Sequence, residues 1–262
     1  MKFDSPAVFI TARTKSSRLP EKCLLEINGK KIIEHIIERA KLIQNSHKII
    51  LCTTLEESDN ILCEIAEQHN ISYFRGSTID KLDRWYRATK EFKVSHFVTF
   101  DADDLFCEPE LNELALNQMK ANKVDFIFSE KIIPGSFTYC INTEALKEVC
   151  RIKNTDDTEM MWTYFLDTNI FKTELLKIQN INDYERNGVR ITLDYIEDYI
   201  FFAKIFNKLN IVDNNHSLIE ILKFLDNNKE ICEINYRDID LAYKKAKILK
   251  KNLERLIWSL NG

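Results

Sequence analysis

The sequence predicts an α/β fold of the Rossmann-like, doubly wound type, built on a mostly parallel sheet. Short apolar runs recur along the first half of the chain, each followed by a polar segment, and amphipathic helical patterns lie between them. Strands buried on both faces of a parallel sheet have such continuous apolar runs, and their alternation with helices indicates repeated βα units. With 262 residues, 45% of them hydrophobic, the chain is long enough for a single domain with a sizeable core.

Three apolar runs are predicted to be strands of this sheet: 7–10, 49–52 and 97–100. Residues with helical spacing predict helices within 32–43, 61–66 and 82–88, and a further helix at about 110–121 leads to the apolar run 124–128. Ligands of such sheets bind beyond the carboxyl ends of the strands. We therefore expect the site in the loops that begin at Thr11, Thr53 and Asp101.

The periodicity weakens between residues 129 and 189, where aromatic residues accumulate. We expect this stretch to be an inserted lobe for acceptor binding within a single domain spanning 1–262, and its candidate acceptor contacts are Tyr139, Glu159, Trp162 and Tyr164. Helical patterns return at about 196–207 and 217–226. A last apolar stripe runs from Leu241 to Ile257, and it predicts a helix that packs on the core or forms a dimer contact.

Charge and composition argue against several classes of partner. The net charge of −4 mixes 37 basic with 41 acidic residues without a long run of either sign, so we expect no nucleic-acid partner. No leader pattern is present, and no apolar run approaches the ~20 residues of a membrane span. The seven cysteines include no C-x-x-C pair and are expected to be reduced thiols. Together these features predict a cytoplasmic protein with no membrane partner.

The strongest local signal is the loop T-A-R-T-K-S-S-R-L-P-E-K, residues 11–22, directly after the first predicted strand. It concentrates four cations and several hydroxyl groups. Arginine and lysine form strong charge-assisted hydrogen bonds with phosphate oxygens, so the loop suits a polyphosphate. It lacks the G-x-x-x-x-G-K-[ST] pattern of a P-loop. On its own, a solvated surface loop is the alternative.

Two acidic segments complete the pattern. Asp101, Asp103 and Asp104 follow the predicted strand 97–100, and carboxylates crowded at a strand end need a counter-charge such as Mg²⁺. An exposed acidic turn is the alternative interpretation. The segment Arg190–Asp194 is predicted to be a strand that ends in a carboxylate, followed by a helix near Glu197 and Asp198, whose charges suit a helix N-terminus.

These three segments resemble the motifs of the cytidylyltransferase family, which includes the spore-coat polysaccharide type, the CMP-Kdo synthetases and the CMP-acylneuraminate synthetases. The matching stretches are A-R-x-x-S-S-R-L-P-x-K, the acidic segment through Pro109, and R-I-T-L-D-Y-I-E-D-Y. The sequence departs from the family pattern at Lys15, where a glycine is usual at or beside the position, and at Ala102 and Leu105. The resemblance implies a fold of the nucleotide-diphospho-sugar transferase type and a homodimer.

The resemblance also implies roles for individual residues. Asp103 and Asp194 would hold Mg²⁺ and Arg190 would orient the acceptor, while Glu197 and Asp198 are expected to cap the helix. A triphosphate would be held by Arg13, Ser17, Arg18 and Lys22, and the rest of the nucleotide site would be formed by Thr11, Ala12, Thr53, Arg75 and Asp101. Arg13, Arg18, Lys22, Asp103 and Asp194 are the candidate catalytic residues.

The implied reaction is in-line attack by a small anionic acceptor on the α-phosphorus of CTP, with release of pyrophosphate. Acceptors of the relatives include acidic sugars and phosphorylated small molecules of surface-polysaccharide and capsule pathways, and a CTP:phosphoglutamine cytidylyltransferase is one similar enzyme. A glycosyltransferase of similar fold is the alternative, but it would not need a cationic loop for departing pyrophosphate. A non-catalytic nucleotide-binding module is a further alternative.

Overall fold

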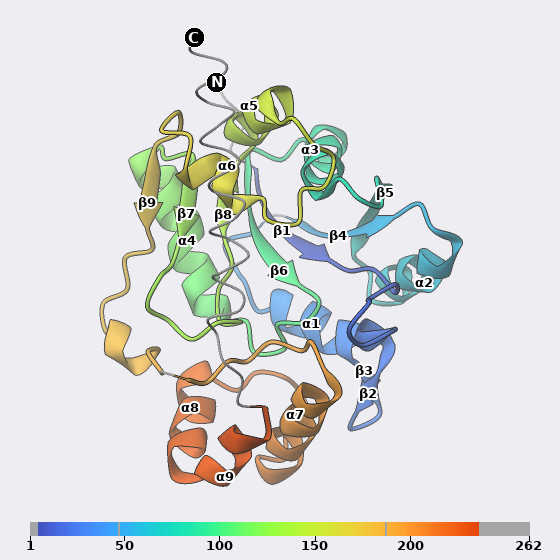
Figure 1. Ribbon diagram of the computed structural model, residues 1–262, viewed down its shortest axis with the longest axis vertical. Coiled ribbons are helices and arrows are strands. Elements are labelled where there is room, and N and C mark those ends of the chain that lie inside the picture. Colours follow the sequence, from blue (N-terminus) through green and yellow to red (C-terminus); the bar gives the residue numbers. More distant parts are fainter. Residues whose placement is uncertain (1–4, 47, 187, 236–262) are drawn as a thin grey trace.

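The centre of the molecule is a seven-stranded sheet (Figure 1). The computed structural model describes residues 5–46, 48–186 and 188–235, and all structural statements refer to these residues. The strand order is β5-β4-β1-β6-β8-β7-β9. The strands are β1 (Pro6–Thr11), β4 (Lys48–Thr54), β5 (Ser72–Gly76), β6 (His96–Asp101), β7 (Phe126–Phe128), β8 (Cys140–Asn142) and β9 (Thr173–Leu175), and a separate hairpin joins β2 (Glu26–Ile27) to β3 (Lys30–Lys31).

The sheet is mostly parallel. Strands β5, β4, β1 and β6 pair in parallel, and so do β7 and β9. Strand β8 lies between β6 and β7 and is antiparallel to both. The predicted fold class, a doubly wound and mostly parallel α/β sheet, is confirmed, with one reversed strand that the sequence did not reveal.

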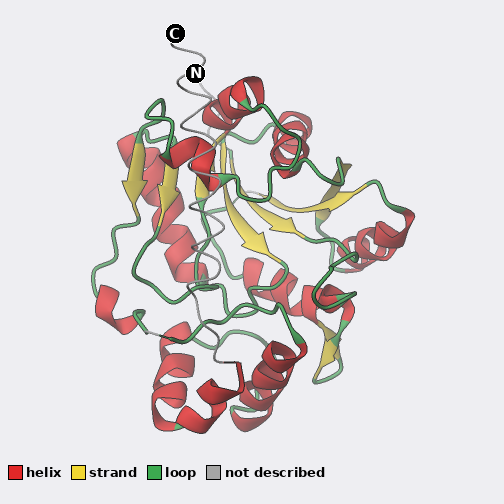
Figure 2. Cartoon of the chain, viewed as in Figure 1, coloured by secondary structure: helices red, strands yellow, loops and turns green. Residues whose placement is uncertain are grey.

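Helices cover both faces of the sheet (Figure 2). The helices of the described residues are α1 (Ile32–Ala40), α2 (Asn60–Gln68), α3 (Lys81–Phe92), α4 (Pro109–Asn122), α5 (Thr143–Ile152), α6 (Trp162–Leu166), α7 (Ile196–Lys208), α8 (Leu218–Asn227) and α9 (Lys229–Cys232). Of these, α7, α8 and α9 gather beyond the sheet, at the bottom of Figure 1. Alternate residues of β1 belong to different cores, since Val8 and Ile10 join one cluster while Ala7 and Phe9 join the other. Burial on both faces explains why this strand is apolar throughout.

The predicted strands and helices of the first half are confirmed with small shifts of their ends. Strand β5 was not expected, and the run 124–128 is a strand only over Phe126–Phe128. The stretch 129–189 contributes β8 and β9 to the central sheet. The predicted helices near 196–207 and 217–226 are α7 and α8, whereas the stripe from Leu241 to Ile257 lies outside the described residues. Within the described part, no helix has both the length and the apolar character needed to span a bilayer.

A close crossing of two chain segments connects the stretch after β7 to the segment before α7. Gly135 has a φ of 95°, and a Cβ atom placed on it would meet the carbonyl oxygen of Ile191 well inside van der Waals contact. Beside this contact the Ile191 N–H donates to the Pro134 carbonyl at 2.9 Å. Only glycine fits both the backbone conformation and the available space.

We expect Gly135→Ala to destabilise the protein, because the added methyl group meets backbone atoms that cannot move independently. Gly29→Ala is the matched control, since Gly29 also has a positive φ, 77°, but has nothing within 4 Å of a Cβ atom. The control should cost about 1 kcal/mol of strain, and Gly135→Ala at least about 2 kcal/mol more. Urea denaturation of both variants measures the difference, and equal losses would contradict the steric argument.

Candidate active site

The predicted loops meet at one edge of the sheet. Strands β1 and β6 end together, with Thr11 paired to Asp101, and β4 ends beside them, with Cys52 paired to Thr11. The backbone N–H of Ala102 donates to Thr11 O at 2.9 Å, and that of Ala12 donates to Cys52 O at 3.3 Å. Parallel register therefore places the cationic loop 11–22 next to the acidic segment 101–104.

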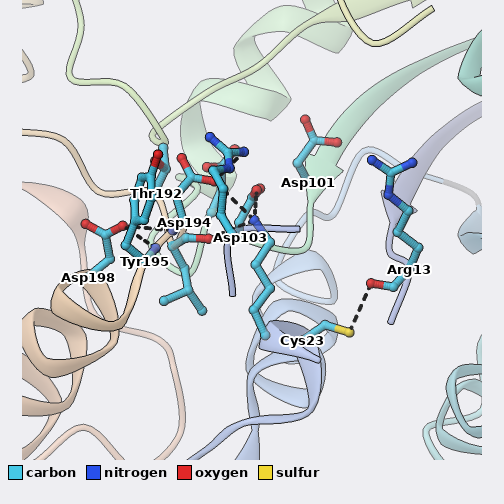
Figure 3. Close-up of polar contacts among 12 residues, drawn as sticks. Arg13, Cys23, Asp101, Asp103, Thr192, Asp194, Tyr195 and Asp198 are labelled. Atoms are coloured by element: carbon cyan, nitrogen blue, oxygen red, sulfur yellow. Dashed lines mark hydrogen bonds and ion pairs between the residues drawn. The ribbon is translucent and has the colours of Figure 1, made fainter. Parts of the chain in front are cut away.

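Lys22 is the cation around which the site is organised. Its ammonium nitrogen lies 2.6 Å from Asp103 Oδ2, 3.3 Å from Asp194 Oδ1 and 2.8 Å from the carbonyl oxygen of Leu193. One ammonium group contacts both carboxylates, so they face the same small volume, and Figure 3 shows Asp103 and Asp194 side by side. Burial opposes the charge on Lys22, but the two carboxylates outweigh this effect and raise its pKa.

Two arginines hold Asp194 from other directions. Arg18 NH2 lies 2.8 Å from Asp194 Oδ1, and Arg190 NH1 lies 3.2 Å from Asp194 Oδ2. Arg18 remains half exposed, and its guanidinium lies over the ring of Tyr195 at 5.7 Å from the centroid. The Arg190 side chain, in contrast, is only 14% exposed.

Asp198 fixes the segment that carries Asp194. The Asp198 carboxylate is fully buried and accepts 2.6 Å hydrogen bonds from Arg190 NH2 on both oxygens. It also accepts the backbone N–H groups of Asp194 and Tyr195, each at 2.8 Å. The prediction that Asp198 caps this helix is confirmed, since it satisfies N–H groups at the start of α7. The same contacts orient Asp194.

The prediction that Arg190–Asp194 forms a strand is wrong. The segment is extended but has no strand partner, because it crosses two loops instead of lying along a sheet edge. The Leu193 N–H donates to the Asp103 carbonyl at 2.8 Å, which connects this segment directly to the acidic loop. That backbone contact brings the neighbouring Asp194 to Asp103.

The three aspartates after β6 are close together but differ in environment. One carboxylate oxygen from each of Asp101, Asp103 and Asp104 lies within 4.8 Å of the others. The side chains of Asp101 and Asp103 are each 25% exposed, whereas Asp104 is buried. Burial raises the pKa of Asp104 well above its ordinary value, and the charges on Asp103 and Asp101 add to the rise.

Asp101 has a cationic partner that sequence reasoning missed. Lys81, at the start of α3, places its ammonium nitrogen 2.9 Å from Asp101 Oδ1 and 4.8 Å from the centroid of the Trp85 ring. Burial raises the pKa of Asp101, and the Lys81 charge opposes this rise. The only available signal was a lysine at the start of a predicted helix, a pattern too common to single it out.

The exposed part of the cationic loop faces open space. Arg13, Ser17 and Arg18 are exposed, as a ligand-binding role requires, whereas Ala12 is buried. Arg13 makes two long contacts, 3.5 Å to Thr78 O and 3.5 Å to Glu159 Oε2. Glu159, a predicted acceptor contact, is thus close to the predicted nucleotide site. Figure 3 shows Arg13 across from Asp101 and away from Asp194.

Three predicted nucleotide contacts, Thr11, Thr53 and Arg75, have hydrogen-bond partners within the protein. The hydroxyl of Thr53, which is fully buried, donates to Asp59 Oδ2 at 3.0 Å. Arg75 donates to Thr54 O, Glu56 O and Asn60 Oδ1. The Thr11 hydroxyl accepts a 3.0 Å hydrogen bond from the Trp85 indole. The described contacts of these side chains support the loops of the site.

The predicted aromatic acceptor contacts pack among other side chains, and Tyr139 is also close enough to Asp101 and Asp104 for their charges to add to the rise in its pKa that burial causes. Tyr139 stacks between Phe126 and Trp162, with ring centroids 5.0 and 6.2 Å away. Tyr164 is buried, and its hydroxyl donates to Asn154 Oδ1 at 3.3 Å. Tyr139 and Trp162 are only partly buried, so of the four predicted acceptor residues of the lobe only Tyr164 is largely inaccessible.

The donor set fits a hard divalent cation. Carboxylate oxygens are the ligands that Mg²⁺ prefers, and usually one or two carboxylates bind it together with substrate phosphates. Here the Lys22 ammonium contacts both Asp103 and Asp194, so these two carboxylates face the same small volume. Asp103 and Asp194 are therefore the carboxylates that would hold the ion, with Asp101 beside them.

Comparison with known proteins agrees with this geometry. A family model described as Cytidylyltransferase matches residues 7–241. An uncharacterized protein of Methanocaldococcus jannaschii is 28% identical over 90% of this chain and 97% of its own length. The spore coat polysaccharide biosynthesis protein SpsF of Bacillus subtilis is 23% identical over 76% of this chain and 85% of its own. The structure of a cytidylyltransferase from Leptospira borgpetersenii superimposes with a TM-score of 0.81 at 21% identity, covering 90% of this chain and 99% of that one.

We expect Asp198→Asn to destabilise the fold by about 3 kcal/mol, because it leaves the buried Arg190 guanidinium without its main counter-charge. Asp226→Asn is the matched control. Asp226 also pairs with an arginine, Arg186, at 2.8 Å, but its side chain is 46% exposed. The control should lose less than about 1 kcal/mol. Chemical denaturation compares the two, and a loss in Asp198→Asn no larger than that of the control would refute this assignment.

Proposed function

Because the chain belongs to the cytidylyltransferase family, we propose that it transfers CMP from CTP to a small anionic acceptor and releases pyrophosphate, with Mg²⁺ as cofactor. The observation that carries the proposal is the convergence of Lys22, Asp103 and Asp194, which are far apart in the sequence. Two carboxylates and a set of cations meet at the carboxyl edge of a parallel sheet, where ligands of such folds bind.

The bound metal ion would neutralise charge on the triphosphate and on the departing pyrophosphate. The residues that would hold it are Asp103 and Asp194. Lys22 keeps these two carboxylates together through contacts of 2.6 and 3.3 Å. The site is therefore preorganised before a ligand arrives, and preorganised charge is the main source of electrostatic stabilisation in enzymes.

Arg13 and Arg18 are the groups best placed to bind phosphate oxygens. Both guanidinium groups are about half exposed, at 44% and 50%, and each makes contacts that a stronger anion can replace. Guanidinium binds phosphate oxygens in pairs, which orients the phosphate as well as attracting it. Positioning of the α-phosphorus by these groups supplies catalysis without a covalent intermediate.

Arg190 is assigned a positioning role. Its guanidinium is engaged by Asp198, Asp194 and Thr192, which ties it to the segment that presents the metal-binding carboxylate. An acceptor anion that binds Arg190 would lie beside Asp194, which the same guanidinium contacts at 3.2 Å. We therefore propose that Arg190 orients Asp194 and, beside it, the bound acceptor.

The acceptor and the pathway belong to the proposal as well. The Bacillus subtilis relative is named a spore coat polysaccharide biosynthesis protein, which supports a pathway that builds a surface polysaccharide, such as a capsule. We propose an acidic sugar or a phosphorylated small molecule, such as phosphoglutamine, as the acceptor, and a cytoplasmic homodimer as the working form. A screen of such acceptors with CTP, scored by the mass of the cytidylylated product, identifies the acceptor.

We expect Asp103→Asn and Asp194→Asn each to lower turnover at least about a hundredfold, because each removes a charge that would stabilise the bound cation. The measurement is pyrophosphate release with CTP, Mg²⁺ and the acceptor found in the screen. Asp213→Asn, an exposed aspartate after α7, should keep the wild-type rate. Near wild-type rates in both site variants would defeat the metal assignment.

We expect CTP to be preferred over UTP and dTTP in the same assay, since the family match implies cytidylyl transfer. The ratio of kcat/KM values with one acceptor is the quantity to measure. A kcat/KM value that is higher with UTP or dTTP than with CTP would assign a different nucleotide to the enzyme, but it would not contradict the metal assignment.

A further inference from the structure

Asp59 is a buried carboxylate that lies outside the acidic cluster and that the proposed chemistry does not use. Asp59 is only 1% exposed and is the last residue of the short 3-10 helix η2 (Glu57–Asp59). Oδ1 accepts the backbone N–H of Thr14 at 2.8 Å and the Thr14 hydroxyl at 2.6 Å. Oδ2 accepts the Thr53 hydroxyl at 3.0 Å, the Thr54 N–H at 3.2 Å and the Thr54 hydroxyl at 2.5 Å.

These contacts satisfy the Asp59 charge with neutral donors. Among the residues that the structure describes, no lysine or arginine forms an ion pair with Asp59. Burial disfavours the charged form, but the hydrogen bonds from Thr14, Thr54 and Thr53 outweigh it and lower the pKa of Asp59. A carboxylate held in this way fixes the geometry of the groups that donate to it. Here those groups belong to two different loops of the site.

Thr14 transmits this geometry to the cationic loop. Its N–H and hydroxyl bind Asp59, while its carbonyl oxygen accepts the N–H of Glu21 at 3.0 Å. The second bond closes the turn formed by residues 14–21, which carries Arg18. Lys22 follows Glu21 directly and begins the short 3-10 helix η1 (Lys22–Leu24). The position of Thr14 therefore helps to determine where Arg18 and Lys22 stand.

The segment that carries Asp59 is itself held in place. Arg75 donates to Thr54 O at 2.9 Å, to Glu56 O at 2.8 Å and to Asn60 Oδ1 at 2.6 Å, spanning the segment from end to end. Lys15 adds an exposed ion pair to Glu56 at 2.7 Å. The cationic loop thus lies against a wall, residues 54–60, that Arg75 fixes to β5.

We infer that Asp59 is a positioning residue for the triphosphate, which acts by fixing Thr14 and through it the loop that presents Arg18 and Lys22. This inference rests on the proposed function, since it assumes that the loop binds CTP. The loop has Lys15 where a glycine could have allowed a tight backbone path, and the Asp59 contacts supply the constraint by hydrogen bonding. Thr53 and Arg75 influence nucleotide binding through the same wall.

Asp59→Asn tests the inference because an amide cannot satisfy both sides of the site. Its oxygen can accept from only one side, and its NH2 group then faces a backbone N–H, either of Thr14 or of Thr54. We expect the variant to bind MgCTP about tenfold more weakly or worse, since small displacements of binding groups have large effects. Thr14→Val removes only the hydroxyl donor and should weaken binding in the same direction by less. Isothermal titration measures Kd, and thermal unfolding measures Tm.

Glu108→Gln is the matched control. Glu108 is another buried carboxylate with backbone donors, the N–H groups of Leu218 and Glu110, and it also pairs with Arg39 at 3.4 Å. It holds the starts of α4 and α8 instead of the cationic loop. We expect the control to lower Tm without changing the Kd for MgCTP. The inference would be overturned if Asp59→Asn bound MgCTP with wild-type affinity, or if Glu108→Gln lost as much affinity at a similar loss of Tm. Either result would leave the proposed function standing. A wild-type protein that does not bind MgCTP would overturn the proposed function together with it.

Discussion

The site depends on one shared cation. Lys22 contacts two carboxylates that come from distant parts of the chain, and its charge lowers the repulsion between them. Around Lys22, the acidic groups are held more firmly than the arginines. The acids Asp101 and Asp103 are fixed by the end of β6 and the turn after it, whereas Arg13 and Arg18 belong to an exposed loop. Ligand binding can therefore reorient the exposed Arg13 and Arg18 side chains while the acids and Lys22 stay in place.

Much of the fold could be predicted from the sequence because burial imposes a pattern on it. Strands β1, β4 and β6 are apolar on both faces, and α1 to α4 have clear helical spacing. Strand β8 has only three residues, and its burial comes from its neighbours β6 and β7, so nothing local marks it. The segment Arg190–Asp194 has the alternation of a strand, but its partners are loops, which no local pattern can reveal.

The candidate site could be located from the sequence, but the sequence could not tell which residues face the ligand and which hold the loops in place. Charged segments after predicted strands located the region, and the resemblance to the cytidylyltransferase family singled out Lys22, Asp103 and Asp194. Thr53 and Arg75 also follow or belong to strands at this edge, yet their side chains hold neighbouring loops. Asp59 has five donors from two segments, and such a convergence exists only in three dimensions. The hydrogen-bond partners of a side chain show which loop it holds in place, and the residue type alone does not reveal them.

The crossing of Ile191 over Gly135 has a consequence for how the protein is made. Chains fold from the N-terminus as they leave the ribosome, and a nascent chain that has emerged only as far as α5 already contains the cationic loop and Asp103. It still lacks Asp194 and Asp198, so Lys22 has one acidic partner instead of two. The cation site is completed only when the last third of the chain passes over the loop after β7. The second carboxylate that contacts Lys22 is thus delivered late, together with the segment that crosses Gly135.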